Sequence, residues 1–151
     1  MEGQYACRKD IKEIVKLRTL QQQELHITDF KISIEELVSS DTKFLKEHLN
    51  KDFFMQIYKI EKQIVAMCGF QIVKYLPSCD GTTGTVACLC SVYTVLEHRR
   101  QGLQKKIILT CLNAINAKNI QKIELSATNP DAIALYKGLG FDHSKTFMQN
   151  Y

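Results

Sequence analysis

A short basic turn at the start of one predicted helix is the feature that points most clearly to chemistry. Residues 99–106 read Arg-Arg-Gln-Gly-Leu-Gln-Lys-Lys and follow a long apolar stretch. The first amides of a helix have no intrahelical partner, and the helix dipole adds partial positive charge there. Gly102 lacks a Cβ, so the backbone can approach a ligand closely. Positive charge comes from Arg99, Arg100, Lys105 and Lys106. The segment therefore predicts a pyrophosphate site.

Two common phosphate motifs are absent from the sequence. A P-loop requires Gly-x-x-x-x-Gly-Lys-[Ser/Thr], and no such string occurs. A dinucleotide fingerprint requires three spaced glycines, whereas Gly102 stands alone in its turn. From the residue types alone, a basic helix start is weak evidence, and a solvated N-terminal turn without any ligand is the favoured interpretation.

Two segments together resemble the GNAT superfamily of N-acetyltransferases. The stretch Arg99-Arg-Gln-Gly-Leu-Gln104 resembles the signature Gln/Arg-x-x-Gly-x-Gly/Ala, with matches at Arg99 and Gly102. Gln104 departs from the small residue of that signature. Residues 127–141 resemble the C-terminal segment of the family, in which Asn, Ala, Tyr and Gly-Phe recur at this spacing. The similarity covers essentially the whole chain.

The resemblance implies that acetyl-CoA is the co-substrate and that no metal takes part. In the family, the strand before the basic turn splays from its neighbour, and its free backbone groups pair with the pantetheine arm like an added strand. Here Val95 is the residue we expect to make this contact. The implied cofactor-binding residues are Val92, Tyr93, Thr94, Val95, Arg99, Arg100, Gln101, Gly102, Leu103, Gln104, Lys105, Asn129 and Tyr136.

The resemblance also implies catalytic roles. An amine attacks the thioester and coenzyme A leaves as a thiolate, so a phenol beside the sulfur, matched here by Tyr136, can act as general acid. The alternative is an ordinary core tyrosine. Asn129 is expected to touch the pantetheine arm, to cap the following helix, or both. Glu97 is a candidate general base, although it can equally be a rim charge beside Arg99.

The acceptor remains open at the level of sequence. The family builds its acceptor pocket from segments that correspond here to residues 25–34 and 77–84. Asp29 and Asp80 would attract a cationic amine, whereas Arg18 would attract an acidic acceptor. Residues of these types are more often ordinary surface charges. We expect a small-molecule or peptide primary amine. The alternative function is a catalytically weak GNAT-fold module that binds or senses acetyl-CoA, to which Gln104 points.

The elements that must position these residues follow from periodicity and turn signals. Strands are expected at 5–8, 53–60, 64–76, 85–96, 122–127 and 145–151. Helices are expected at 11–25, 33–49, 102–118 and from 130 to Gly138 or Gly140. Ser40 and Asp41 are expected to interrupt the second helix, and Asp10 to cap the first one with Glu13 as its partner. The order β-α-α-β-β-β-α-β-α-β predicts an α/β (mixed α+β) fold of the GNAT acyltransferase type, with a mixed sheet and helices on both faces.

Composition limits the remaining choices. The chain has 151 residues, 45% of them hydrophobic and 24% charged, which predicts one folded domain over residues 1–151. The net charge of +4 is mild, so neither nucleic acid nor membrane is expected as a partner, while a homodimer is possible. The polar N-terminus favours a cytoplasmic protein. The six cysteines are expected to be buried, reduced thiols.

Overall fold

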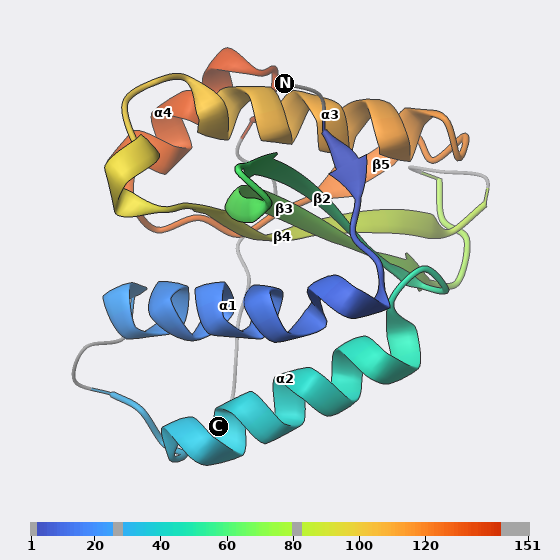
Figure 1. Cartoon of the computed structure of the whole chain (residues 1–151). Coiled ribbons are helices and arrows are strands. Elements are labelled where there is room, and N and C mark those ends of the chain that lie inside the picture. Colours follow the sequence, from blue (N-terminus) through green and yellow to red (C-terminus); the bar gives the residue numbers. More distant parts are fainter. Residues whose placement is uncertain (1–2, 26–28, 80–82, 143–151) are drawn as a thin grey trace.

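A computed structural model describes residues 3–25, 29–79 and 83–142, and within them a mixed sheet lies between two layers of helices (Figure 1). The sheet has five strands in the spatial order β1-β2-β3-β4-β5. Neighbouring strands are antiparallel except β4 and β5, which are parallel. The strands are β1 (Gln4–Tyr5), β2 (Phe53–Ile60), β3 (Gln63–Lys74), β4 (Thr85–Thr94) and β5 (Lys122–Glu124). The predicted mixed sheet is confirmed.

Helices cover both faces of the sheet, as the order of elements predicts. The helices α1 (Ile11–Leu25) and α2 (Ile34–His48) lie on one face, and α3 (Leu103–Asn116) and α4 (Pro130–Gly138) lie on the other (Figure 1). Each layer has its own apolar core. The α1 side buries Ile14, Leu45, Met55 and Ile57, and the α3 side buries Phe70, Ile107, Ile108 and Cys111. Burying one such aliphatic or aromatic side chain stabilises the fold by about 1.5–3 kcal/mol.

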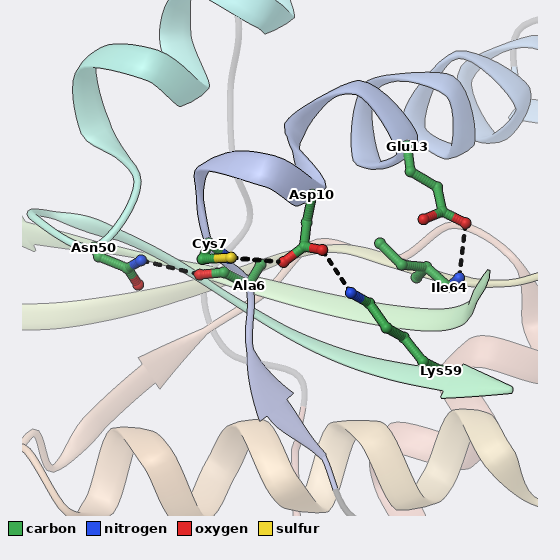
Figure 2. Close-up of polar contacts among 7 residues, drawn as sticks. All are labelled: Ala6, Cys7, Asp10, Glu13, Asn50, Lys59 and Ile64. Atoms are coloured by element: carbon green, nitrogen blue, oxygen red, sulfur yellow. Dashed lines mark hydrogen bonds and ion pairs between the residues drawn. The ribbon is translucent and has the colours of Figure 1, made fainter. Parts of the chain in front are cut away.

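The N-terminal segment differs from the prediction. The first strand ends at Tyr5, because Arg8–Asp10 forms a 3-10 helix (η1) capped by Cys7. Asp10 is therefore not the N-cap of α1, contrary to the prediction. Its Oδ2 instead accepts the Cys7 amide at 2.9 Å and the Cys7 thiol at 3.3 Å. Its Oδ1 pairs with Lys59 Nζ at 2.6 Å, and Figure 2 shows this pair and the thiol contact. Glu13, the expected capping partner, accepts the Ile64 amide at 2.7 Å.

The predicted break at Ser40 and Asp41 is also wrong, since α2 continues through both residues. Ser and Asp disfavour helix interiors when their side chains bond to the nearby backbone. Asp41 does not do so, because its Oδ2 lies 2.9 Å from Arg18 Nε on α1. The capping box of Ser33 and Glu36 fixes the start of the helix. Tertiary pairing thus overrides the local propensity.

The ends of several other strands differ from the predicted ends by a few residues. β4 ends at Thr94 because Leu96–His98 forms a second 3-10 helix (η2), β3 ends at Lys74, and β5 ends at Glu124. The helix α4 begins after Asn129 as predicted. The strand predicted at 145–151 lies outside the described residues. In the described ranges, no helix is long and apolar enough to cross a membrane.

Candidate functional site

The strands β4 and β5 separate halfway along β4. Their pairing runs from Val86 opposite Lys122 to Cys88 opposite Glu124, and β4 then continues to Thr94. Among the described residues, no strand pairs with that edge of β4 beyond Cys88. A bulge bends the strand at the same place, because Ser91 has a positive φ of 52°. The sheet is therefore open on one side of residues 89–94.

Three polar side chains on successive turns of α1 hold β4 at this opening, and we call them the α1 ladder. Their contacts are Arg18 Nη1 to Ser91 Oγ at 2.6 Å, Gln21 Nε2 to the Val92 carbonyl at 2.7 Å, and the Tyr93 hydroxyl to Glu24 Oε1 at 2.8 Å. Sequence reasoning missed Gln21 and Glu24. Their spacing of three residues, which places them on one helix face with Arg18, is the signal that would have found them.

The basic turn presents a row of unpaired amides. Arg100 has φ 59° and Gly102 has φ 74°, so both adopt the left-handed conformation. The first bond of α3 runs from the Lys106 amide to the Gly102 carbonyl at 3.1 Å. Within the described residues, the amides of residues 100–105 donate to no acceptor. Successive free amides at a helix start form an anion site.

Space for a ligand exists at the same turn. A Cβ built on Gly102 meets no atom within 4 Å. Gly102 is therefore required by its left-handed backbone and not by crowding within the protein. Gln104, which replaces the small residue of the signature, is half-buried on the first turn of α3. Free amides, open space and exposed cations together fit a pyrophosphate.

The guanidinium of Arg99 does not contribute free charge to this turn. Its Nη2 lies 2.7 Å and 2.9 Å from the two carboxylate oxygens of Glu24, and its Nε donates to the Thr94 carbonyl at 2.9 Å. The group also stacks over the Tyr93 ring at 5.3 Å from the centroid. Burial, followed by the hydrogen bond to Glu24, raises the pKa of the Tyr93 phenol. The charge at the turn comes from exposed Arg100 and the first turn of α3.

Tyr136 is a buried tyrosine whose phenol has a raised pKa. Its side chain is 8% exposed and packs edge-on against Phe141 at 5.8 Å between ring centroids. Burial raises the pKa of Tyr136 to about 12, with a further contribution from the thiol of Cys68. Because an ordinary thiol has a pKa of about 8.5, full proton transfer from this phenol to a thiolate is uphill. This environment therefore keeps the phenol protonated at neutral pH.

The remaining predicted residues occupy different positions. Asn129 Oδ1 caps α4 by accepting the amides of Asp131 at 2.8 Å and Ala132 at 3.4 Å, which leaves the Nδ2 group as a donor. Glu97 lies exposed in η2, and its carbonyl accepts Gln101 Nε2 at 3.4 Å. Glu24, in contrast, contacts β4 directly. Asp80 lies outside the described residues.

The structure also differs from two predictions, one about the charge of Arg18 and one about the burial of the cysteines. The sequence predicts that Arg18 would attract an acidic acceptor, but its guanidinium pairs with Asp41 at 2.9 Å. Of the six reduced cysteines, only Cys68 and Cys111 are buried, and Cys79 is exposed. The described ranges hold no cluster of three metal-ligating side chains.

Comparisons with known proteins agree with this architecture. The chain matches the model of the acetyltransferase (GNAT) family over residues 14–141, and it belongs to that family. No curated protein is similar enough in sequence to match the chain.

Solved structures share the fold. A predicted acetyltransferase with acetyl-CoA from Clostridium acetobutylicum superposes with a TM-score of 0.82 at 22% identity, covering 99% of this chain and 95% of that one. A possible acetyltransferase from Clostridium difficile 630 gives 0.80 at 20% identity, with 99% and 95% coverage. A GCN5-related N-acetyltransferase from Ralstonia eutropha JMP134 gives 0.80 at 15% identity, with 99% and 97% coverage. The predicted GNAT fold is confirmed.

Proposed function

We propose that this protein transfers an acetyl group from acetyl-CoA to a primary amine by direct attack. The observation that carries the proposal is the row of free amides at residues 100–105, placed directly after the strand whose edge is open. The anion site suits the pyrophosphate of coenzyme A. The unpaired strand edge, which directly precedes it in the chain, suits the amide-bearing pantetheine arm.

The backbone of Thr94 is better suited to the pantetheine arm than that of Val95. The Val95 amide donates to the Val65 carbonyl at 3.0 Å, and its carbonyl accepts the His98 amide at 3.0 Å. Backbone groups of successive strand residues point to opposite sides, so the Thr94 amide faces the open edge. The buried Thr94 hydroxyl also has no partner in the described structure. Asn129 Nδ2 supplies a second donor.

Tyr136 supports the leaving group in this proposal. Bound acetyl-CoA supplies the activated thioester, and the acceptor supplies the nucleophilic amine. The neutral phenol donates a hydrogen bond where negative charge develops on sulfur, and burial in the α3 layer strengthens that bond. This role is that of a general acid that stabilises charge without releasing its proton completely.

Two carboxylates are candidates to receive the proton of the acceptor amine. Glu97 remains the candidate drawn from sequence. Glu24 is the better placed of the two, because it contacts Tyr93 and Arg99 at the open edge of β4. We expect Glu24→Gln to lower turnover by about 100-fold or more, as loss of a positioned base does, and Glu97→Gln to change it by less than about threefold. Equal losses in both variants would contradict this choice.

The acceptor is proposed to be a small-molecule or peptide primary amine. The test is a panel of such amines with acetyl-CoA, followed by release of the coenzyme A thiol. A blank without acceptor is needed because the protein has an exposed thiol at Cys79 that reacts with thiol reagents. Release that depends on one amine supports the proposal, and absence of release across the panel contradicts it.

The second candidate function is an acetyl-CoA-binding or sensor module. Gln104 supports it, because a long side chain replaces the small residue of the signature at the first turn of α3. Tight cofactor binding without thiol release for any amine would identify this function. Gln104→Ala would then strengthen cofactor binding if the side chain crowds the pyrophosphate.

A further inference from the structure

A long groove lies between α1 and α2, away from the open edge of β4. Its volume is about 1160 Å³, and its walls come from one face of each helix. Lys12, Lys16 and Leu20 line it on three successive turns of α1, and Val38, Thr42 and Lys46 line it on three successive turns of α2. None of the three α1 ladder residues lines the groove, and all three contact β4. The groove is therefore separate from the proposed acetyl-transfer site.

One end of the groove is strongly basic. The helices run in opposite directions, so the start of α1 lies beside the end of α2 (Figure 1). Five cationic side chains line the groove: Arg8, Lys9, Lys12, Lys16 and Lys46. An adjoining hollow of about 400 Å³ shares Arg8 and Lys46 and adds Lys51. Most of this charge gathers at the same end.

The positive charge at this end is not neutralised by the protein. Among the described residues, none of the lining cations forms an ion pair. Glu13 is the one acidic side chain of the lining, and its Oε1 accepts the Ile64 amide on the sheet (Figure 2). Nearby Asp10 is buried and pairs with Lys59. The basic end therefore remains available to an anion.

The other end of the groove is apolar and uncharged. Leu20 is 39% exposed and Val38 is 37% exposed, and with Thr19 they close the wall. Ile11 and Val15 form a buried apolar floor along α1. The distance along α1 from Lys12 to Leu20 is roughly 12 Å at 1.5 Å per residue. The groove is thus basic at one end and apolar at the other.

We propose that this groove binds a single-chain amphiphile with an anionic head, of the fatty-acid class. The head would lie among Arg8, Lys12 and Lys46, and the chain would extend over Val15 toward Leu20 and Val38. A head-to-tail arrangement suits such a ligand because charge and apolar surface are separated along its length. The alternative ligand, an acidic helix of a partner protein, would need cations along the whole length of the groove. The apolar end of the lining has no cation.

The experiment measures binding of laurate below its micellar concentration by calorimetry, with acetate and dodecanol as ligands that have only the head or only the chain. We expect saturable, single-site binding of laurate and at least about tenfold weaker binding of either control. Lys12→Gln combined with Lys46→Gln should weaken laurate binding by about 10- to 100-fold. Val38→Gln should weaken it by about fivefold.

Control variants and competition with coenzyme A test whether laurate binds in this groove. Lys74→Gln on β3 and Leu109→Gln on α3 remove an exposed charge and an exposed apolar residue elsewhere, and both should leave the laurate affinity unchanged. Saturating coenzyme A should also leave it unchanged. Displacement by coenzyme A would place laurate in the cofactor site and overturn the proposal. Equal loss in the matched variants, absence of laurate binding, or binding only to intact vesicles of anionic phospholipid would overturn it as well.

Discussion

Replacing Gly102 by asparagine or by aspartate separates the backbone role of this position from its electrostatic role. Gly102 has φ 74°, and a side chain there meets no protein atom within 4 Å. Both replacements tolerate the left-handed conformation better than other residues do, so each should cost about 1 kcal/mol of folding free energy or less. The melting temperature should fall by at most about 2–4 °C for a chain of this size.

Coenzyme A affinity should respond very differently in the two variants. An added carboxylate about 4 Å from a phosphate charge costs about 1 kcal/mol in bulk water and about 4 kcal/mol at the effective dielectric of a protein surface. Gly102→Asp should therefore weaken coenzyme A binding by about 5-fold to several hundredfold relative to Gly102→Asn. The same aspartate should not destabilise the helix, because negative charge near a helix start is favourable.

The assay is calorimetric titration of both folded variants with coenzyme A, repeated at high salt. Salt should narrow the difference between them, since it screens the repulsion of exposed charges. Equal affinities for the aspartate and asparagine variants would refute the placement of the pyrophosphate at this turn. A loss of affinity that both variants share would show that the backbone alone is critical.

Three further outcomes follow from the same structure. Tyr136→Phe should lower turnover by about 100-fold while changing the coenzyme A dissociation constant little; wild-type turnover in a folded variant would leave Tyr136 a packing residue. Acetyl-CoA at 100 times its dissociation constant should stabilise the fold by about 2.7 kcal/mol, seen as a melting shift. Burial opposes ionisation of Asp10, but hydrogen bonds from Lys59 and Cys7 outweigh it and hold the pKa below its ordinary value. The stability from this ionised group is fully present above the unfolded pKa of about 3.9 and is lost as pH falls through the folded pKa. Asp10→Asn should therefore flatten the decline in unfolding free energy below about pH 4, and an unchanged decline would contradict the assignment.

The sequence predicted the elements with strong periodicity and missed those decided by tertiary contacts. The strand β2 and the helix α1 have the expected ends, because a continuous apolar run and a helical stripe are local signals. The continuity of α2 depends on Asp41 meeting Arg18 across two helices, which no local pattern contains. The 3-10 helix at Arg8–Asp10 depends similarly on Asp10 turning back to Cys7 and meeting Lys59.

The same division applies to the candidate site. The basic turn, the capping role of Asn129 and the start of α4 were readable, since each involves neighbours in the chain. Glu24 and Gln21 were not, because they act across about 70 residues of sequence, at separations of 69 and 71 from their partners on β4. The pairing of Arg99 with Glu24, which removes its charge from the turn, was hidden for the same reason.

The most direct test of the central claim is a titration of isotope-labelled protein with coenzyme A, followed by amide chemical shifts. If the turn holds the pyrophosphate, the amides of residues 100–105 and of Thr94 should show the largest changes, because their free N–H groups gain an acceptor. Amides along the groove of α1 and α2 should change little. Saturation with the largest changes elsewhere, or no change at millimolar coenzyme A, would contradict the account.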